Sequence, residues 1–464
     1  MTQLLERLKE IAGPGGWSTD PIELEPHLTE WRGVYSGRTL VLLKPRSTAA
    51  VAAIVRACAE HGVGIVPQGG NTSMCGGAVP DDSGQQVVLS LSRMNRVRKV
   101  DARNFSMEVD AGCVLAHAQD AARQAGRYLP LSLGAEGTCQ VGGTIATNAG
   151  GMNVGRYGTA RALVLGLEVV LADGTVLDSL RSLRKDTAGY DLKQLFIGSE
   201  GTLGIITAAS LRLYPDPGEL STALIGIENA GDAVELLGVL KAALDDRVES
   251  FELVSQRVFG LVTRYIPGAR LPFDDEYPWY VLLEAATGGR RELLENVLAD
   301  AAERDLLLTA VIAKNEKEAA ELWRLRHSIA EAERHDGRSL KHDISVPLSA
   351  MQAFLARGDE LLASCHPEAK LVAFGHVGDG NLHYNVVLPR DLGAEAWVEE
   401  GDRVTRRIYD LVRELGGSFS AEHGVGQAKR AWLAEYRAGP ELDLMRQLKK
   451  TLDPANILNP GKVI

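Results

Sequence analysis

Three glycine-rich stretches are the features of the sequence that most restrict its fold. They read VPQGGNTSMCGG over residues 66–77, LSLGAEGTCQVGGTIATNAGGMNVGRYG over 131–158 and FIGSEGTLGIIT over 196–207. Glycine clusters after apolar strands let backbone N–H groups turn inward and approach an anion such as a phosphate. Taken alone, each stretch could equally be a set of ordinary turns. Because neither GxGxxG nor GxxxxGK[ST] occurs, the stretches together predict a phosphate-bearing cofactor held by some other fold.

The pattern of expected strands and helices changes near Pro215 and Pro217. Before this break, short strands alternate with glycine-rich turns and one clear helix, which Ser47 should cap at its start and Gly62 should end. After it, strands alternate with longer charged helices up to about Pro389, and the rest is helical. We therefore predict an N-terminal helical segment (1–35), a cofactor domain (36–215), an α+β substrate domain (216–415) and a C-terminal segment that returns to the cofactor domain (416–464).

Composition narrows the range of partners. The chain has 464 residues, and its 50 basic and 61 acidic side chains give a formal net charge of −11, which argues against nucleic acid or an anionic membrane. Its five cysteines are scattered and odd in number, which is typical of reduced thiols in a cytoplasmic protein. No uncharged apolar run approaches the roughly 20 residues of a membrane helix. Soluble enzymes of this size are commonly homodimers.

A second feature is GHVGDGNLHYN, residues 375–385, which lies between two apolar runs. The Gly-Asp-Gly-Asn turn and its flanks predict a β-hairpin that brings His376 and His383 together. Two such histidines suit a metal ion or simply a polar loop. A catalytic zinc usually has three protein ligands, and SAEHGVG, residues 420–426, offers Glu422 as the third.

The glycine-rich stretches, together with the terminal NPGK, resemble the FAD-binding domain of the vanillyl-alcohol oxidase/p-cresol methylhydroxylase superfamily. The resemblance implies an α+β fold: a PCMH-type FAD-binding domain of two α+β subdomains, a ferredoxin-like α+β substrate (cap) domain and a helical C-terminal segment. It also implies FAD as cofactor. The residues it implies around FAD are Pro67, Gln68, Gly69, Gly70, Asn71, Thr72, Ser73, Gly134, Thr138, Cys139, Gly142, Gly143, Asn148, Gly150, Gly151, Ile206 and Asn459.

Two departures from the superfamily bear on the cofactor. Some relatives attach FAD through a histidine in the first loop, whereas Gly-Gly-Asn-Thr stands here, so we expect FAD to be bound non-covalently. Gln68 stands where many relatives have an arginine, so no charge pairing is expected there.

GHVGDGNLHYN and SAEHGVG resemble motifs of the D-2-hydroxyglutarate dehydrogenase and D-lactate dehydrogenase branch. That branch implies a divalent metal, commonly zinc, on His376, His383 and Glu422. A metal ion polarises the hydroxyl of a 2-hydroxy acid, and the flavin accepts the hydride from its α-carbon. We expect His423 to take the hydroxyl proton, since a neutral imidazole can accept it near pH 7. Asn385 should face the same side of its strand as His383 and bind substrate.

Cations in the second domain should bind the acid's carboxylates. Arg324 and Arg326 stand two apart on an expected helix and point in different directions, and Arg326 matches the substrate arginine of the family. Lys341, on an expected strand after Gly337, matches a lysine of the hydroxyglutarate branch and favours a dicarboxylate substrate. One position departs from that branch: Ala330 replaces a substrate-contacting threonine, which would loosen selectivity between acids.

The resemblance therefore implies an FAD- and zinc-dependent enzyme that oxidises D-2-hydroxyglutarate, with D-malate as a further substrate. Electrons would pass to a separate acceptor such as an electron-transferring flavoprotein or a quinone. Two alternatives stay open: a D-lactate or glycolate dehydrogenase on the same scaffold, and a non-catalytic FAD-binding subunit of a larger complex.

Overall fold

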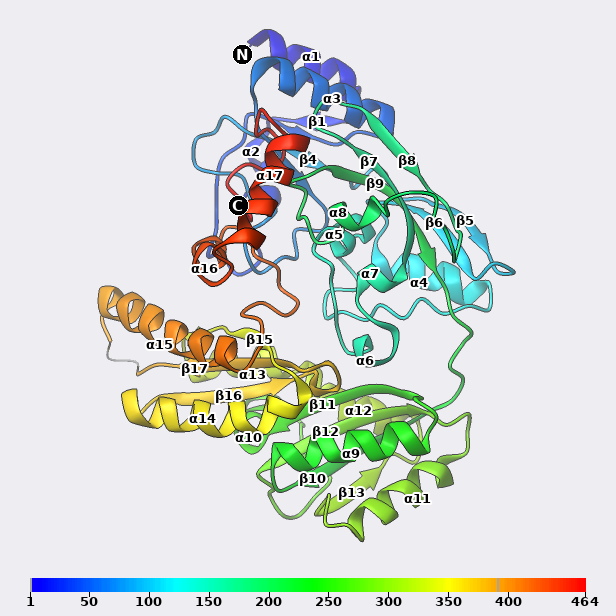
Figure 1. The fold of residues 1–464 in the computed structure, drawn as a ribbon, viewed down its shortest axis with the longest axis vertical. Coiled ribbons are helices and arrows are strands. Elements are labelled where there is room, and N and C mark those ends of the chain that lie inside the picture. Colours follow the sequence, from blue (N-terminus) through cyan, green and yellow to red (C-terminus); the bar gives the residue numbers. More distant parts are fainter. Residues whose placement is uncertain (1, 390–391) are drawn as a thin grey trace. The chain divides into compact units, whose positions relative to one another are not determined.

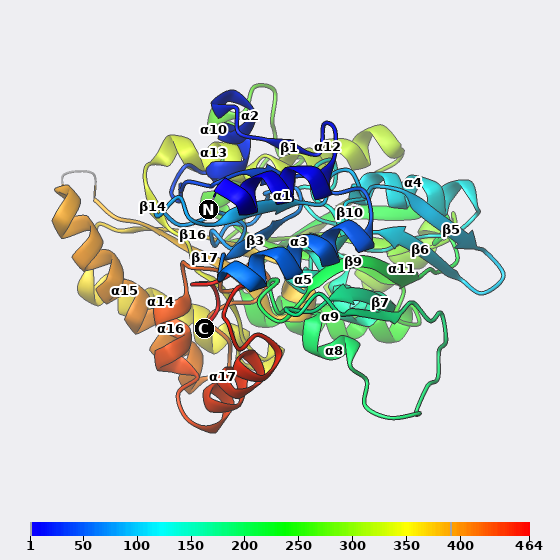
Figure 2. The same ribbon diagram turned by 90° about the horizontal axis from the view of Figure 1, so that it is seen from above.

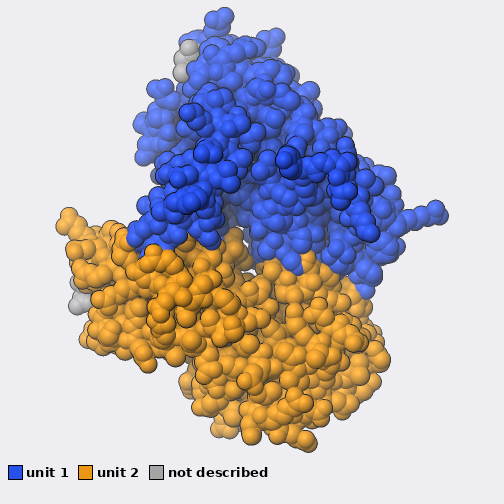
Figure 3. Space-filling view, in the orientation of Figure 1, with its two compact units in different colours: residues 1–150, 158–216, 423–464 blue, residues 151–157, 217–422 orange. Residues whose placement is uncertain are grey.

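The computed structural model describes residues 2–389 and 392–464, and it divides into two compact units (Figure 3). Unit 1 consists of residues 1–150, 158–216 and 423–464. Unit 2 consists of residues 151–157 and 217–422. Each unit has its own sheets and its own buried core, so each is described by itself.

Unit 1 contains two sheets (Figure 1). The four-stranded sheet has the order β1-β2-β4-β3, with β1 (Trp17–Ser18), β2 (Leu42–Leu43), β4 (Val87–Ser90) and β3 (Ile65–Gln68). The five-stranded antiparallel sheet has the order β5-β6-β9-β7-β8, with β5 (Val97–Asp101), β6 (Ser106–Asp110), β9 (Ile205–Arg212), β7 (Val164–Val170) and β8 (Val176–Ser179). These two sheets correspond to the α+β architecture expected of a PCMH-type FAD-binding domain.

The helices of unit 1 come from all three of its chain segments. They are α1 (Thr2–Ala12), α2 (Pro21–Leu28), α3 (Thr48–His61), α4 (Leu115–Gln124), α5 (Val141–Ala146), α7 (Ala160–Leu163), α8 (Lys193–Phe196), α16 (Arg430–Tyr436) and α17 (Pro440–Leu452). Helices α1 and α3 lie side by side in both views (Figure 1, Figure 2), and Leu4, Leu8 and Ile54 belong to one buried cluster. The expected caps of α3 are confirmed: Ser47 accepts from the N–H of Ala50, and Gly62 has φ +63°.

Unit 2 is built on one antiparallel sheet of order β13-β10-β12-β11-β16-β17-β14, with β15 also paired to β17. Its strands are β10 (Leu220–Ile227), β11 (Val248–Ser255), β12 (Trp279–Ala286), β13 (Thr309–Ile312), β14 (Ser339–Leu340), β15 (Asp343–Ser345), β16 (Lys370–Gly375) and β17 (Asn381–Val387). Its helices are α6 (Val154–Tyr157), α9 (Ala230–Ala243), α10 (Gln256–Tyr265), α11 (Arg291–Ala302), α12 (Glu316–His327), α13 (Ile329–Asp336), α14 (Met351–Cys365) and α15 (Ala394–Glu414).

Successive side chains of a strand point to opposite faces of the sheet, and one face of the unit 2 sheet packs against helix α12. Leu224, Val254 and Leu282 point to one face of the sheet and pack with apolar residues of α10, α12 and α13. Because side chains two apart in a strand share a face, Glu252 and Glu284 must point to the same side. Two acidic side chains are thereby placed beneath α12.

The predicted hairpin is confirmed. Strands β16 and β17 pair antiparallel, with Phe374 opposite His383. The connecting turn is a short 3₁₀ segment that ends at Gly380, whose φ of +84° suits glycine. The expectation that Lys341 lies on a strand is wrong: β14 ends at Leu340 and β15 begins at Asp343, so Lys341 lies in the break between them.

Candidate active site

The hairpin brings the two histidines together as expected. His376 follows the last residue of β16, His383 lies within β17, and their ring centroids are 5.6 Å apart. Both residues are buried, with 8% of His376 and 9% of His383 exposed. They are therefore part of an interior polar cluster rather than a surface loop.

Glu422 lies against both rings. Its carboxylate is 3.8 Å from Nε2 of His376 and 3.6 Å from Nε2 of His383. A tetrahedral zinc ion with Zn–N and Zn–O distances of about 2.0–2.2 Å separates neighbouring ligand atoms by roughly 3.3 Å. Glu422 faces each imidazole with a different oxygen, Oε2 toward His376 and Oε1 toward His383, at separations somewhat longer than this value, so the three side chains lie close enough to share such an ion. The donors expected from the sequence, His376, His383 and Glu422, are thus brought together.

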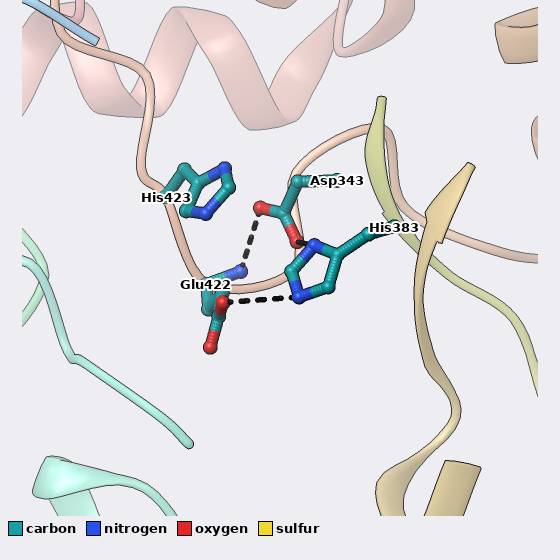
Figure 4. A group of neighbouring side chains, drawn as sticks. All are labelled: Asp343, His383, Glu422 and His423. Atoms are coloured by element: carbon teal, nitrogen blue, oxygen red, sulfur yellow. Dashed lines mark hydrogen bonds and ion pairs between the residues drawn. The ribbon is translucent and has the colours of Figure 1, made fainter. Parts of the chain in front are cut away.

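Asp343 and His423 extend this cluster (Figure 4). Ligand atoms of Asp343, His383, Glu422 and His423 all lie within 4.8 Å of one another, a group that does not include His376. Asp343 already accepts two hydrogen bonds, at 2.9 Å from Asn381 Nδ2 and at 3.0 Å from the backbone N–H of Glu422. Asp343 thus holds the backbone of Glu422 in place, while His376 Nε2 faces the carboxylate of Glu422 from outside this group.

A buried carboxylate behind His376 links this histidine to an arginine. Glu252 of β11 contacts His376 Nδ1 at 2.5 Å through one oxygen and accepts from Arg326 Nε at 2.7 Å through the other. Arg326 is at the end of α12 and is 11% exposed, whereas the Glu252 side chain is fully buried. Arg324, two residues earlier, points outward to the carbonyls of Pro267 and Gly268. The predicted divergence of the two arginines is confirmed.

The charges of this cluster are strongly coupled. Burial tends to lower the pKa of His376, but the neighbouring Glu252 carboxylate outweighs it and raises the pKa to about 9. Burial tends to raise the pKa of Glu252, which His376 and Arg326 instead bring below its usual value. Burial raises the pKa of Glu422 to about 7. Glu252 is thus the anion that His376 and Arg326 share.

A second buried carboxylate organises the other predicted substrate residues. Glu333 of α13 binds the ammonium group of Lys341, accepts from Ser339 at 2.9 Å and accepts from Asn385 Nδ2 at 3.1 and 3.3 Å. Asn385 is in β17 with His383 and, like it, is buried. Ala330, the position that departs from the hydroxyglutarate branch, is in the first turn of α13 and exposed.

In unit 1, the first glycine-rich loop begins at the end of β3 and approaches the start of α5. A Cβ at Gly70 would lie 2.1 Å from the carbonyl oxygen of Thr138, so only glycine fits there. Gly143 faces open space, with no heavy atom within 4 Å of a built Cβ. Gln140 Oε1 is buried without a hydrogen-bond partner among the described residues. Open space over glycine backbone beside an unpartnered acceptor fits a bound cofactor.

Asn459 also has a buried side-chain oxygen without a hydrogen-bond partner among the described residues. Its Nδ2 donates to the carbonyls of Gly77 and Glu200, while its buried Oδ1 has no partner in the part of the chain that the structure describes. A flavin ring carries an N–H that could satisfy this oxygen. Asn459 therefore fits the role implied by the resemblance.

Other residues of the first loop are engaged within the protein. The amide of Gln68 donates to the carbonyls of His27 and Ala78, and its oxygen contacts His27 Nδ1. Asn71 donates to the carbonyls of Pro26 and Thr29 with φ +53°. These two side chains therefore hold the loop against the segment of residues 26–29.

The remaining cofactor residues implied by the resemblance fall into three groups. Pro67, Gly69, Thr72 and Ser73 lie on β3 or the loop after it, and Gly134, Thr138, Cys139, Gly142, Asn148 and Gly150 lie within or beside α5. Ile206 is buried in β9. Gly151 is the exception, because it belongs to unit 2.

Glu252, Glu333 and Asp343 were not among the site residues expected from the sequence. Each is an acidic residue in or beside an apolar strand or helix face, and each is at least 97% buried. A buried carboxylate needs a cation or several donors, so an acid within the apolar run SFELV was the available signal.

Comparison with solved structures identifies the class of fold. The chain matches p-cresol methylhydroxylase with bound substrate at a TM-score of 0.75, 17% identity, and coverage of 100% of this chain and 96% of that one. At this identity the match shows the fold alone, which is that of the vanillyl-alcohol oxidase/p-cresol methylhydroxylase flavoproteins. The expected α+β fold class is confirmed.

Comparison with known sequences gives the family. The family described as "FAD linked oxidases, C-terminal domain" matches residues 217–463, and "FAD binding domain" matches residues 39–179. The chain belongs to the FAD-linked oxidases and is an FAD-dependent oxidoreductase. Two relatives are mitochondrial D-2-hydroxyglutarate dehydrogenase of Bos taurus, 41% identical over 97% of this chain and 81% of that protein, and D-2-hydroxyglutarate dehydrogenase of Xanthomonas citri pv. viticola, 38% identical over 96% and 93%. Within the described residues, no helix is long and apolar enough to cross a membrane.

Proposed function

We propose that this protein oxidises D-2-hydroxyglutarate, and also D-malate, to the corresponding 2-oxo acid, with FAD and a zinc-like divalent cation. The observation that carries the proposal is the arrangement within unit 2, where Nε2 of both His376 and His383 faces the carboxylate of Glu422. The names of the two relatives support the choice of substrate.

His376, His383 and Glu422 would hold the divalent ion. Two neutral nitrogens and one carboxylate are a donor set that zinc accepts in catalytic sites while keeping a position for substrate. Asp343 holds the backbone N–H of Glu422 at 3.0 Å and so fixes the third donor.

Arg326 would bind the carboxylate next to the reacting carbon. Its Nε is used by Glu252, and its two terminal nitrogens have no hydrogen-bond partner among the described residues, so both can donate to a substrate carboxylate. Lys341 would bind the distal carboxylate of a dicarboxylic acid, and Asn385 would help to orient the substrate.

When bound, FAD accepts the hydride of the α-carbon, and a divalent cation withdraws electron density from the α-hydroxyl oxygen. His423, adjacent to Glu422 and within the same group of donor atoms, would take the hydroxyl proton on an imidazole nitrogen. The chain's own part in the reaction is therefore to fix the acid through its carboxylates and to remove one proton.

FAD would be held non-covalently by the first two glycine-rich loops and by Asn459, whose buried Oδ1 has no hydrogen-bond partner among the described residues. Reduced flavin would pass its electrons to a separate acceptor such as an electron-transferring flavoprotein or a quinone.

Steady-state turnover of D-2-hydroxyglutarate, D-malate, D-lactate and glycolate with an artificial electron acceptor tests the proposal. The expected order puts the dicarboxylates first in kcat/KM. Faster turnover of D-lactate or glycolate would reassign the protein to the rival activity. No turnover of any of these acids by protein replete with FAD and zinc would support a non-catalytic FAD-binding subunit instead.

A further inference from the structure

We infer that Glu252 is a positioning residue that orients a metal donor and the substrate arginine together. The inference rests on the proposed function, because it takes His376 as a ligand and Arg326 as the carboxylate-binding residue. It adds that one buried carboxylate joins these two residues, because one oxygen of Glu252 contacts His376 and the other contacts Arg326.

The first oxygen acts on His376. Its contact with Nδ1 at 2.5 Å makes Nδ1 the proton-bearing nitrogen once the ring is neutral, and this leaves the lone pair on Nε2. Nε2 is the nitrogen that lies 3.8 Å from Glu422. Histidines that bind metals usually donate their other N–H to a carboxylate or carbonyl, which fixes the tautomer and the ring. Glu252 supplies this contact.

The second oxygen acts on Arg326. It accepts from Nε at 2.7 Å, and the guanidinium carbon lies 4.9 Å from the centroid of Phe374. The bond at Nε and the ring beneath fix the plane of the guanidinium. Its two terminal nitrogens then point in one defined direction, which matters for a bidentate contact with a carboxylate.

The burial of Glu252 means that a substitution at this position should disturb at least one of its two contacts. Glu252 is fully buried in β11, between Phe251 and Leu253, which are also buried. A glutamine keeps the shape but has only one oxygen, so its amide N–H₂ would face either His376 Nδ1 or Arg326 Nε. One of the two would lose its acceptor, and either His376 would change tautomer or Arg326 would turn.

Glu284 provides a matched control. It lies on the neighbouring strand β12, faces the same helix α12 and is partly buried, but it accepts from Trp323 Nε1 at 3.0 Å and Thr222 Oγ1 at 3.2 Å rather than from site residues. A single amide oxygen can accept from both. Glu284→Gln thus removes a partly buried carboxylate from the same face of the sheet without touching the proposed link.

The test uses the full-length FAD-loaded protein stripped of metal. Zinc affinity is measured by competition with a chromophoric chelator, and KM and kcat for D-2-hydroxyglutarate are measured at saturating zinc. Glu252→Gln should weaken zinc binding by about 10–100-fold, the range found when partners of metal-binding histidines are removed. It should also raise KM, while Glu284→Gln leaves both values near wild type.

Glu252→Asp is the second variant, because it keeps the charge but is one methylene too short to reach both partners. It should lose zinc affinity or raise KM even if Glu252→Gln does not fold. Wild-type zinc affinity and KM in both folded variants, with only the melting temperature lowered, would overturn the inference and leave Glu252 a structural residue. Failure of the wild-type protein to bind zinc would instead overturn the proposed metal site, and the inference with it.

Discussion

The ammonium group of Lys341 lies against the carboxylate of Glu333, which also binds Asn385 Nδ2 through both of its oxygens. The Lys341 side chain is 34% exposed, whereas the Glu333 side chain is 3% exposed. Glu333 therefore holds the lysine from the buried side. A second carboxylate, that of a substrate, can reach the lysine from its exposed side.

Replacing Lys341 with methionine should affect dicarboxylic acids selectively. Loss of one charge-assisted contact, worth about 1.5–3 kcal/mol, should lower kcat/KM for D-2-hydroxyglutarate by about 10–100-fold. D-Lactate has no distal carboxylate, so its kcat/KM should stay close to wild type. Lys370→Met is the control, because Lys370 pairs with Asp336 of the same helix α13. An equal loss for both acids would contradict a distal-carboxylate role.

Arg326→Lys should impair all 2-hydroxy acids alike, because they share the carboxylate next to the reacting carbon. Lysine retains the charge but lacks the planar pair of donors, so kcat/KM should fall by about 10-fold or more for both D-2-hydroxyglutarate and D-lactate. Arg324→Lys, two residues earlier and directed outward, should behave as wild type. A loss confined to one of the two acids would show that Arg326 reads a different part of the substrate.

His423→Ala should abolish reduction of the flavin by substrate while FAD stays bound. The expected fall in the reduction rate is about 10²–10⁴-fold, the usual contribution of a general base. Stopped-flow absorbance measures it, and the flavin spectrum reports FAD content. His61→Ala, an exposed histidine on α3, serves as control. Near-normal reduction in His423→Ala would remove this residue from the mechanism.

Glu284 should make stability depend on pH. Burial raises the pKa of this carboxyl above its value in the unfolded chain, so the folded state binds the proton more tightly. Stability is thus highest below the unfolded pKa, near 4.5, and falls as pH rises through the folded pKa. Glu284→Gln cannot ionise, so the melting temperature of the variant should rise relative to that of wild type as the pH is raised above about 4.5. A difference that is constant with pH would contradict the assignment.

Local signals in the sequence were enough to predict part of the structure. Ser47 and Gly62 mark the two ends of α3, and the turn before Asn381 marks the hairpin of β16 and β17, because caps and turns depend on neighbouring residues. The pairing of His376 with His383 followed directly from that hairpin.

The residues that hold the site could not be found in this way. Glu252 is 124 residues from His376 and 74 from Arg326, so only the packing of α12 on the sheet brings them together. The position of Lys341 was also wrong in detail, since β14 ends one residue earlier. The alternation of apolar residues in a strand predicts which face of the sheet a residue such as Glu252 occupies. It does not predict which charged side chain from a distant element will contact that residue.

Anaerobic reduction of the bound flavin by D-2-hydroxyglutarate tests the central claim most directly, because it needs neither an electron acceptor nor turnover. The rate is compared in protein as purified, after treatment with a chelator, and after zinc is returned. If His376, His383 and Glu422 hold a catalytic metal, chelation should slow reduction by at least about 100-fold, and zinc should restore it. An unchanged rate in chelated protein that contains no metal would contradict the account and leave these residues a purely structural cluster.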